Sequence, residues 1–152
     1  MSILLSNNIN ISIKKRIKVD NMADYSVTIA EVSKELSPKE RIAFKDLNNA
    51  YKFDDLFSDD NEVVKNGGLV IAPSHWGLLK IHNEKSENKD YDTYVIVDKD
   101  GQKYYTSSKS FWSSFNDILT EMVGVDEEWS IEVTAHPSQN YKGKSYFTAS
   151  II

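Results

Sequence analysis

The sequence predicts a strand-rich α+β fold. It is either a small antiparallel barrel, partly open and of the oligonucleotide/oligosaccharide-binding (OB) type, or an antiparallel sheet; in both cases one long helix packs on it. Two observations lead to this prediction. Several short segments alternate apolar and polar residues between turn signals, which is typical of half-buried strands. One segment, residues 108–123, instead repeats apolar residues at three- and four-residue spacing. A chain of 152 residues fits a single domain.

The first predicted elements lie before residue 62. The stretch YSVTIAEV (25–32) alternates and is rich in β-branched residues, so it predicts a strand. Ser37 is followed by proline and, at the third position, by glutamate, which is the capping-box pattern of a helix start. The stretch YKFDDLFSDDN (51–61) mixes aromatic and acidic residues. It predicts a short turn or loop that pins Phe53 and Phe57 into the core.

The middle of the chain predicts a broken strand and a hairpin. Residues 69–84 read as two strand pieces interrupted at Pro73, because proline cannot donate a hydrogen bond to a ladder. The stretch YDTYVIVDKDGQKYYTS (91–107) predicts a hairpin whose turn, DKDG, has Gly101 available for a positive φ.

The last part of the chain predicts the long helix and a second hairpin. A serine caps the start of the helix and Gly124 ends it. WSIEVTAH (129–136) alternates cleanly, PSQNYKGK turns the chain, and SYFTASII (145–152) returns it as the last strand. Because this last strand ends on apolar residues and carries no charge after Lys144, an unprotected edge is expected there. We therefore expect a homo-oligomer, with a dimer favoured.

Charge divides the chain into two parts. Residues 1–21 hold four basic side chains against one acid, a net of +3, whereas residues 22–152 hold 14 basic and 22 acidic side chains, a net of −8. Met22 reads as a natural start, and residues 1–21 as an upstream extension for which no ordered structure is expected; the competing hypothesis is a basic arm that binds nucleic acid. Residues 22–152 form the predicted domain. No apolar run approaches the ~20 residues that span a bilayer, so we expect a cytoplasmic protein with no membrane partner.

The motifs of catalysis are absent from the sequence. It has no cysteine, no G-x-S-x-G elbow and no phosphate-binding glycine loop. His75 and His82 are seven residues apart, which places them on opposite faces of a regular strand, so they are poor co-ligands of a metal. We therefore expect no catalytic residues, no cofactor, no metal and no enzymatic activity.

Aromatic residues with lysines beside them are the more suggestive pattern. Rings on a sheet face with lysines at its border are how proteins hold single-stranded nucleic acid without reading its sequence. The competing interpretation is that tyrosine is simply a favoured strand residue that packs across strands. The candidate residues are Tyr94, Tyr104, Tyr105 and Tyr141 for stacking on bases, and Lys99, Lys103, Lys142 and Lys144 for contacts with phosphates.

The segments DYDTYVIVDKDGQKYYTSSKSFWSSFNDI, WSIEV and PSQNYKGKSYFTASI resemble a group of small proteins from phages of Gram-positive bacteria. These are described as single-stranded DNA-binding proteins of replication and recombination. The resemblance runs from about Met22 to Ile152 and implies a phage protein that coats or escorts single-stranded DNA. The alternative function is a phage anti-defence protein. Such a protein would bind a host defence protein as an acidic DNA mimic, or sequester a nucleotide signal.

Overall fold

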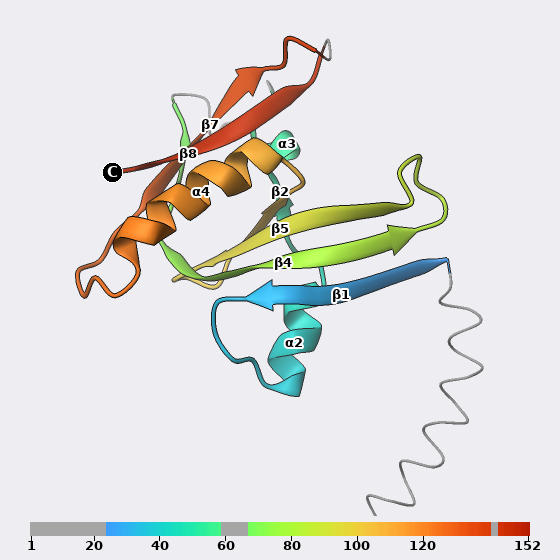
Figure 1. The fold of residues 1–152 in the computed structure, drawn as a ribbon, viewed down its shortest axis with the longest axis horizontal. Helices are drawn as coiled ribbons and strands as arrows, with labels where there is room; N and C mark the ends of the chain where they lie inside the picture. The colour runs from blue at the N-terminus through green and yellow to red at the C-terminus, as the bar shows by residue number, and fades with distance from the viewer. Residues whose placement is uncertain (1–23, 59–66, 141–142) are drawn as a thin grey trace, which may run out of the picture.

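A computed structural model describes residues 24–58, 67–140 and 143–152 of the chain. They form an α+β structure in which two sheets, one of five strands and one of three, are not joined into a closed barrel (Figure 1). The elements are β1 (Tyr25–Val32), α2 (Pro38–Lys45), β2 (Tyr51–Lys52), α3 (Phe53–Leu56), β3 (Leu69–Ile71), β4 (Pro73–Asn83), β5 (Asp90–Asp98), β6 (Lys103–Thr106), α4 (Lys109–Met122), β7 (Ile131–Pro137) and β8 (Ser145–Ile151).

The larger sheet has the strand order β1-β4-β5-β6-β2. Its first three pairings are antiparallel, whereas the short β2 lies parallel to β6. The predicted hairpin is confirmed as β5 and β6, and Gly101 in its turn has a φ of 88°. Such a positive φ is costly for any residue with a Cβ. The sequence therefore predicted the hairpin of β5 and β6 in this sheet, but it did not predict the short strand β2 at the edge of the sheet.

The strands β3 and β4 are two parts of one extended stretch that serves both sheets. The pairing register shifts between Pro73 and His75, which confirms the predicted break. Before the break, β3 pairs with β7, and after it β4 pairs with β1 and β5. With β8 paired to β7, the smaller sheet has the order β3-β7-β8. The predicted final hairpin, β7 and β8, is also confirmed.

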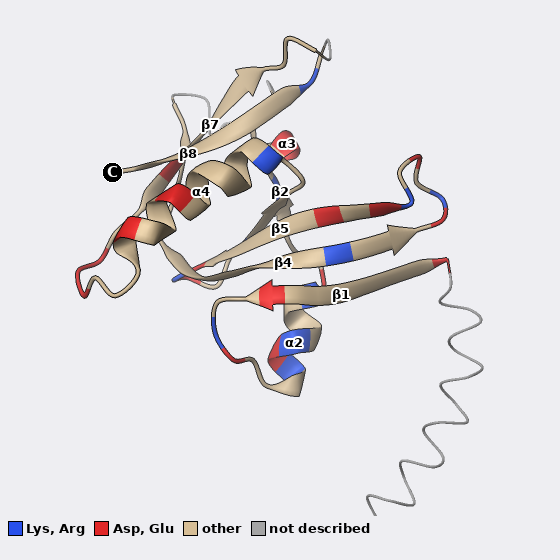
Figure 2. Cartoon of the chain, in the orientation of Figure 1, with Lys and Arg blue, Asp and Glu red and all other residues tan. Residues whose placement is uncertain are grey.

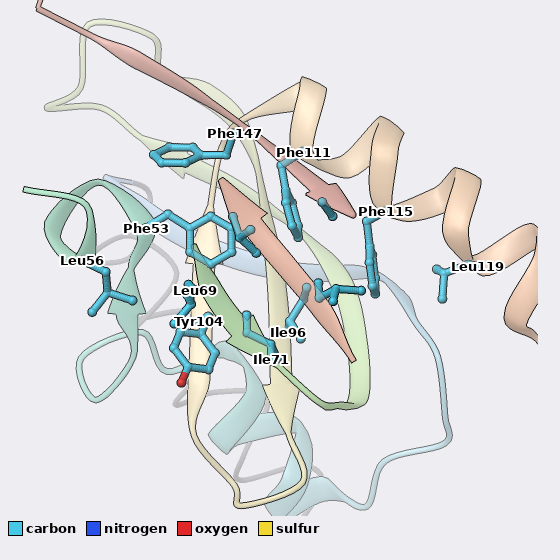
Figure 3. Packing of buried hydrophobic residues seen from close by; sticks show 13 residues of the cluster. Phe53, Leu56, Leu69, Ile71, Ile96, Tyr104, Phe111, Phe115, Leu119 and Phe147 are labelled. Carbon is cyan, nitrogen blue, oxygen red and sulfur yellow. The ribbon is translucent and has the colours of Figure 1, made fainter. Parts of the chain in front are cut away.

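The larger of two hydrophobic clusters lies between the sheets and α4 (Figure 3). The predicted helix is confirmed: Ser108 caps it, accepting a hydrogen bond from the Phe111 backbone N–H at 3.3 Å. The rings of Phe111 and Phe115 point from the helix into the cluster and are fully buried. Phe53 packs edge-on against Phe111, with 5.0 Å between ring centroids. Phe53 is therefore in the core as predicted, but it belongs to a short helix, α3, and not to a loop.

The second cluster lies on the other face of the five-stranded sheet. There Phe44 of α2 packs with Leu36 over Leu79, Ile81 and Val95 of the sheet. The predicted capping box at the start of α2 is present in both directions between Ser37 and Glu40. The five-stranded sheet thus packs against a hydrophobic cluster on each face, so the alternation of residues along β5 and β6 sends side chains into one cluster or the other.

The expectation of an unprotected last strand is wrong along Phe147–Ala149, because α4 lies against β8 and its serines bind the strand edge that faces away from β7. The hydroxyls of Ser108 and Ser114 accept hydrogen bonds from the backbone N–H groups of Phe147 (3.2 Å) and Ala149 (2.8 Å). The hydroxyl of Ser110 donates to the Phe147 carbonyl at 3.1 Å. Self-association stays a prediction, but this part of the edge no longer supports it.

In the three described ranges, no helix has both the length and the apolar character needed to cross a membrane.

Candidate nucleic-acid interface

Two of the tyrosines predicted to stack on bases, Tyr94 and Tyr104, lie on the inner face of the β5–β6 hairpin and are buried. Tyr94 and Tyr104 are each 6% exposed. The Tyr94 ring stacks on Trp112 of α4, with centroids 4.8 Å apart and planes 9° apart. The Tyr104 hydroxyl donates to the Gln102 side-chain oxygen at 2.8 Å, and its ring lies 5.9 Å from that of Tyr51. The helix and the neighbouring strand therefore cover Tyr94 and Tyr104, and the predicted stacking of either ring on a base would require these contacts to open.

Tyr105 points to the opposite face, as its alternation with Tyr104 predicts, and is half-buried against the second cluster. Burial raises its pKa, and the nearby carboxylates of α3 raise it further. Tyr25 lies near both Tyr91 and Tyr105. Burial raises the pKa of Tyr25, and the charges of these two tyrosines raise it further. Tyr25 is 48% exposed. We call Tyr25, Tyr91 and Tyr105 the tyrosine face.

The two lysines predicted on this hairpin are both engaged. Lys103 is half-buried, and its ammonium group donates to the carbonyl oxygens of Ala43 and Asp46 at the C-terminal end of α2. It therefore caps that helix, and its predicted contact with a phosphate would require these hydrogen bonds to be given up. Burial lowers the pKa of Lys103. Lys99 is exposed and forms an ion pair with Glu128 at 3.5 Å. Because an exposed pair of this kind is worth little, Lys99 can exchange it for another anion.

The basic turn of the final hairpin is described only in part. The predicted residues Tyr141 and Lys142 lie outside the described residues. Gly143 has a φ of 78°, as a turn glycine requires, and Lys144 follows it at an exposed position. The backbone N–H of Ser138 donates to the Lys144 carbonyl at 2.9 Å, which closes the turn above the two strands.

A pair of stacked rings lies directly below this turn. His136 and Tyr146 are opposite one another in the register of β7 and β8, and their rings stack with centroids 5.0 Å apart and planes 20° apart. The His136 Nε2 is 2.9 Å from the Thr148 hydroxyl, which holds the imidazole in place. Tyr146 is 41% exposed. We call His136 and Tyr146 the hairpin platform.

Sequence reasoning missed this platform because it placed His136 at the end of the strand 129–136 without pairing it with a residue of the last strand. A signal for it was present: counting outward from a turn at 138–144 places the two residues in cross-strand register. Side chains that face one another across an antiparallel pair come within contact distance.

The histidines predicted to be poor metal co-ligands do lie on opposite faces of β4. His75 stacks on Phe44 in the second cluster, with 5.9 Å between centroids, and burial lowers its pKa. His82 is held between Asp90 and Glu84 on the other face. Among the residues that the structure describes, no group of three or more histidine, cysteine or acidic side chains is arranged to hold a metal ion.

Comparisons with known proteins found no matching family model, no matching curated protein and no matching solved structure.

Proposed function

We propose that this protein binds single-stranded nucleic acid, without catalysis, and that the final hairpin is a principal contact. The observation that carries the proposal is the hairpin platform: an ordered, partly exposed ring pair immediately below a basic turn. Bases of any identity can stack on such rings, and lysines at their border meet the phosphates. This is the function that the phage-protein resemblance implies, with single-stranded DNA as the ligand.

The order of elements from Leu69 to Ile151 supports an OB-type fold as part of the proposal. If β3 and β4 count as one bent strand, five strands follow one another, with α4 between the third and the fourth. OB folds bind oligonucleotides on the face of their second and third strands and on the loops joining strands one to two and four to five. Here that face carries the half-buried rings of Tyr91 and Tyr105, and the second loop is the basic turn.

The acidic charge of the chain limits how such a protein can bind. Residues 22–152 carry a net of −8, so long-range attraction to phosphates is weak and affinity must come from local contacts. Base stacking is a contact of this kind, at about 1–3 kcal/mol per base. We expect binding whose salt dependence is shallow and which depends strongly on the exposed rings.

The test is a fluorescence-anisotropy titration of labelled oligo-dT at low and high salt. The variant Tyr146→Ala should weaken binding about 5- to 150-fold, the equivalent of one lost stacking contact. Tyr51→Ala is the matched control, since Tyr51 is similarly exposed (48%) and also contacts a ring but lies on the edge strand β2. Absence of oligo-dT binding at low salt would end the proposal. Equal losses in the two variants would remove the hairpin platform from it.

A second candidate function is suggested by the acidic residues at the C-terminal end of α4 and in the loop after it (Figure 2). Asp117, Glu121 and the run 126–128 are all exposed. A surface of this kind can imitate the charge of DNA and block a nuclease, as an anti-defence protein would. The measurement is inhibition of host nuclease activity by the purified protein. A variant with lysines at 126–128 should inhibit less, and no inhibition by the parent protein would contradict this function.

A further inference from the structure

An open groove of about 600 Å³ lies on the inner side of the five-stranded sheet. It exists because α4 covers only part of this face. The helix reaches Tyr94, where Trp112 stacks, while β1, β4 and β5 continue beyond its first turn (Figure 1). The volume falls within the range of about 300–1,000 Å³ that is typical of small-molecule sites.

The floor of the groove is built from polar side chains that lie side by side across the three strands. The pairing registers define two rows, Ser26–His82–Asp90 and Thr28–Lys80–Asp92. The first position of each row supplies a hydroxyl, the second a basic group and the third a carboxylate. A ligand lying across the strands therefore meets hydrogen-bond donors and acceptors in alternation.

Each carboxylate on this floor already has a cationic partner. Lys80 is 3.4 Å from Asp92, and the Nδ1 of His82 is 2.7 Å from Asp90. The Nε2 of His82 is 2.6 Å from Glu84. Both hydrogen bonds favour the imidazolium form and raise the pKa of His82, the bond to Asp90 contributing most. The acids of the floor are therefore locally neutralised and oppose a bound anion only weakly.

The rim adds a positive charge. Lys109, at the start of α4, lines the groove and has no ion pair or hydrogen-bonded side-chain partner within the part of the chain that is described. Ser107 beside it hydrogen-bonds to Thr93 at 3.3 Å and so has a fixed position at the end wall. Lys80, His82 and Lys109 thus line the groove together with the carboxylates of Asp90 and Asp92, in a chain whose overall charge is −5.

We propose that this groove binds a small molecule carrying a phosphate monoester on a hydroxylated ring, either a sugar phosphate or a ribonucleotide. The phosphate lies at the Lys109 end, within reach of Lys80, because charge-assisted hydrogen bonds to an ammonium are the strongest available there. The ring hydroxyls lie along the floor, where Asp90 and Asp92 accept hydrogen bonds and the serine and threonine hydroxyls complete the network. This site is separate from the hairpin platform and does not depend on nucleic-acid binding.

Isothermal titration calorimetry of the full chain tests the site with four probes: ribose 5-phosphate, adenosine 5′-monophosphate, ribose and inorganic phosphate. Both esters should bind about tenfold or more tightly than ribose or inorganic phosphate, because only the esters use both ends of the groove. A preference between the two esters distinguishes a sugar phosphate from a ribonucleotide. Lys109→Glu should weaken ester binding about tenfold or more, and Lys39→Glu, which changes an exposed lysine on α2, should leave it unchanged.

Three results would overturn the proposal: no heat from either ester at millimolar concentration, equal effects of the two lysine variants, or inorganic phosphate binding as tightly as the esters. Urea unfolding of each variant verifies that it is folded. Thr28→Trp provides a second line of evidence, because filling the floor should abolish ester binding. Tyr146→Ala should leave ester binding intact, so failure here and failure of the nucleic-acid proposal are distinguishable.

Discussion

The hydroxyl of Ser114 joins α4 to the edge of β8, and its removal should destabilise the protein measurably. It accepts a hydrogen bond from the Ala149 backbone N–H at 2.8 Å and donates to the Phe111 carbonyl at 2.9 Å. In Ser114→Ala, the N–H of the buried Ala149 loses its acceptor, which costs about 1–3 kcal/mol. Alanine is a better helix former than serine by about 0.5 kcal/mol, which offsets part of this loss. The free energy of unfolding should therefore fall by about 0.5–2.5 kcal/mol.

Ser113→Ala is the matched control, one position earlier on the same helix. Ser113 is exposed, so this variant gains the same helix propensity without giving up the bond to β8. It should be unchanged or more stable by up to about 0.5 kcal/mol. The assay is urea unfolding of both variants followed by circular dichroism, with the slope of the transition checked for constancy. If the two variants unfold within about 0.3 kcal/mol of each other, the serine contacts do not secure the strand edge.

Three further perturbations follow from the packing and charges. Gly77→Ala places a Cβ against the Glu31 carbonyl oxygen and should cost about 1–3 kcal/mol in urea unfolding; parent-like stability would show that β1 can shift freely. Phe53→Ala empties the centre of the larger cluster and should cost about 3–5 kcal/mol, seen as a lower thermal midpoint, and a cost below about 1 kcal/mol would contradict its assigned burial. His82 has a raised pKa, so its stabilising contribution is complete below about pH 6.5 and is lost as the pH rises through the folded-state value. The loss of stability between about pH 6 and pH 9 should therefore be smaller in His82→Gln than in the parent, and identical pH profiles would refute this role.

Local patterns were enough to predict most of the individual elements. The alternation along β5, the serine cap of α4 and the break at Pro73 each depend on residues close together in the sequence. Their physical causes, pleat, capping and a missing N–H donor, act within a few residues. The parallel contact of β2 with β6 was missed because only two residues form it, and no local pattern marks so short a strand.

The candidate site was harder to predict, because exposure depends on what covers each face. Alternation correctly placed Tyr104 and Tyr105 on opposite faces, but it carried no information that each face of this sheet packs against a hydrophobic cluster. In the same way, nothing near Lys103 in the sequence shows that its ammonium group caps a helix some 60 residues earlier. His136 and Tyr146 were overlooked for the complementary reason, since their pairing depends on the register of a hairpin whose turn had to be fixed first.

The bent strand shared by the two sheets also bears on how the protein unfolds. Each hydrophobic cluster includes side chains from the stretch 69–83, Ile71 in one and Leu79 in the other. Neither sheet can come apart without freeing a strand that the other needs, so the two clusters are coupled through a single covalent span. Backbone amides in β5 and in β7 should consequently exchange their hydrogens through the same global opening, at closely similar protection, although they belong to different sheets.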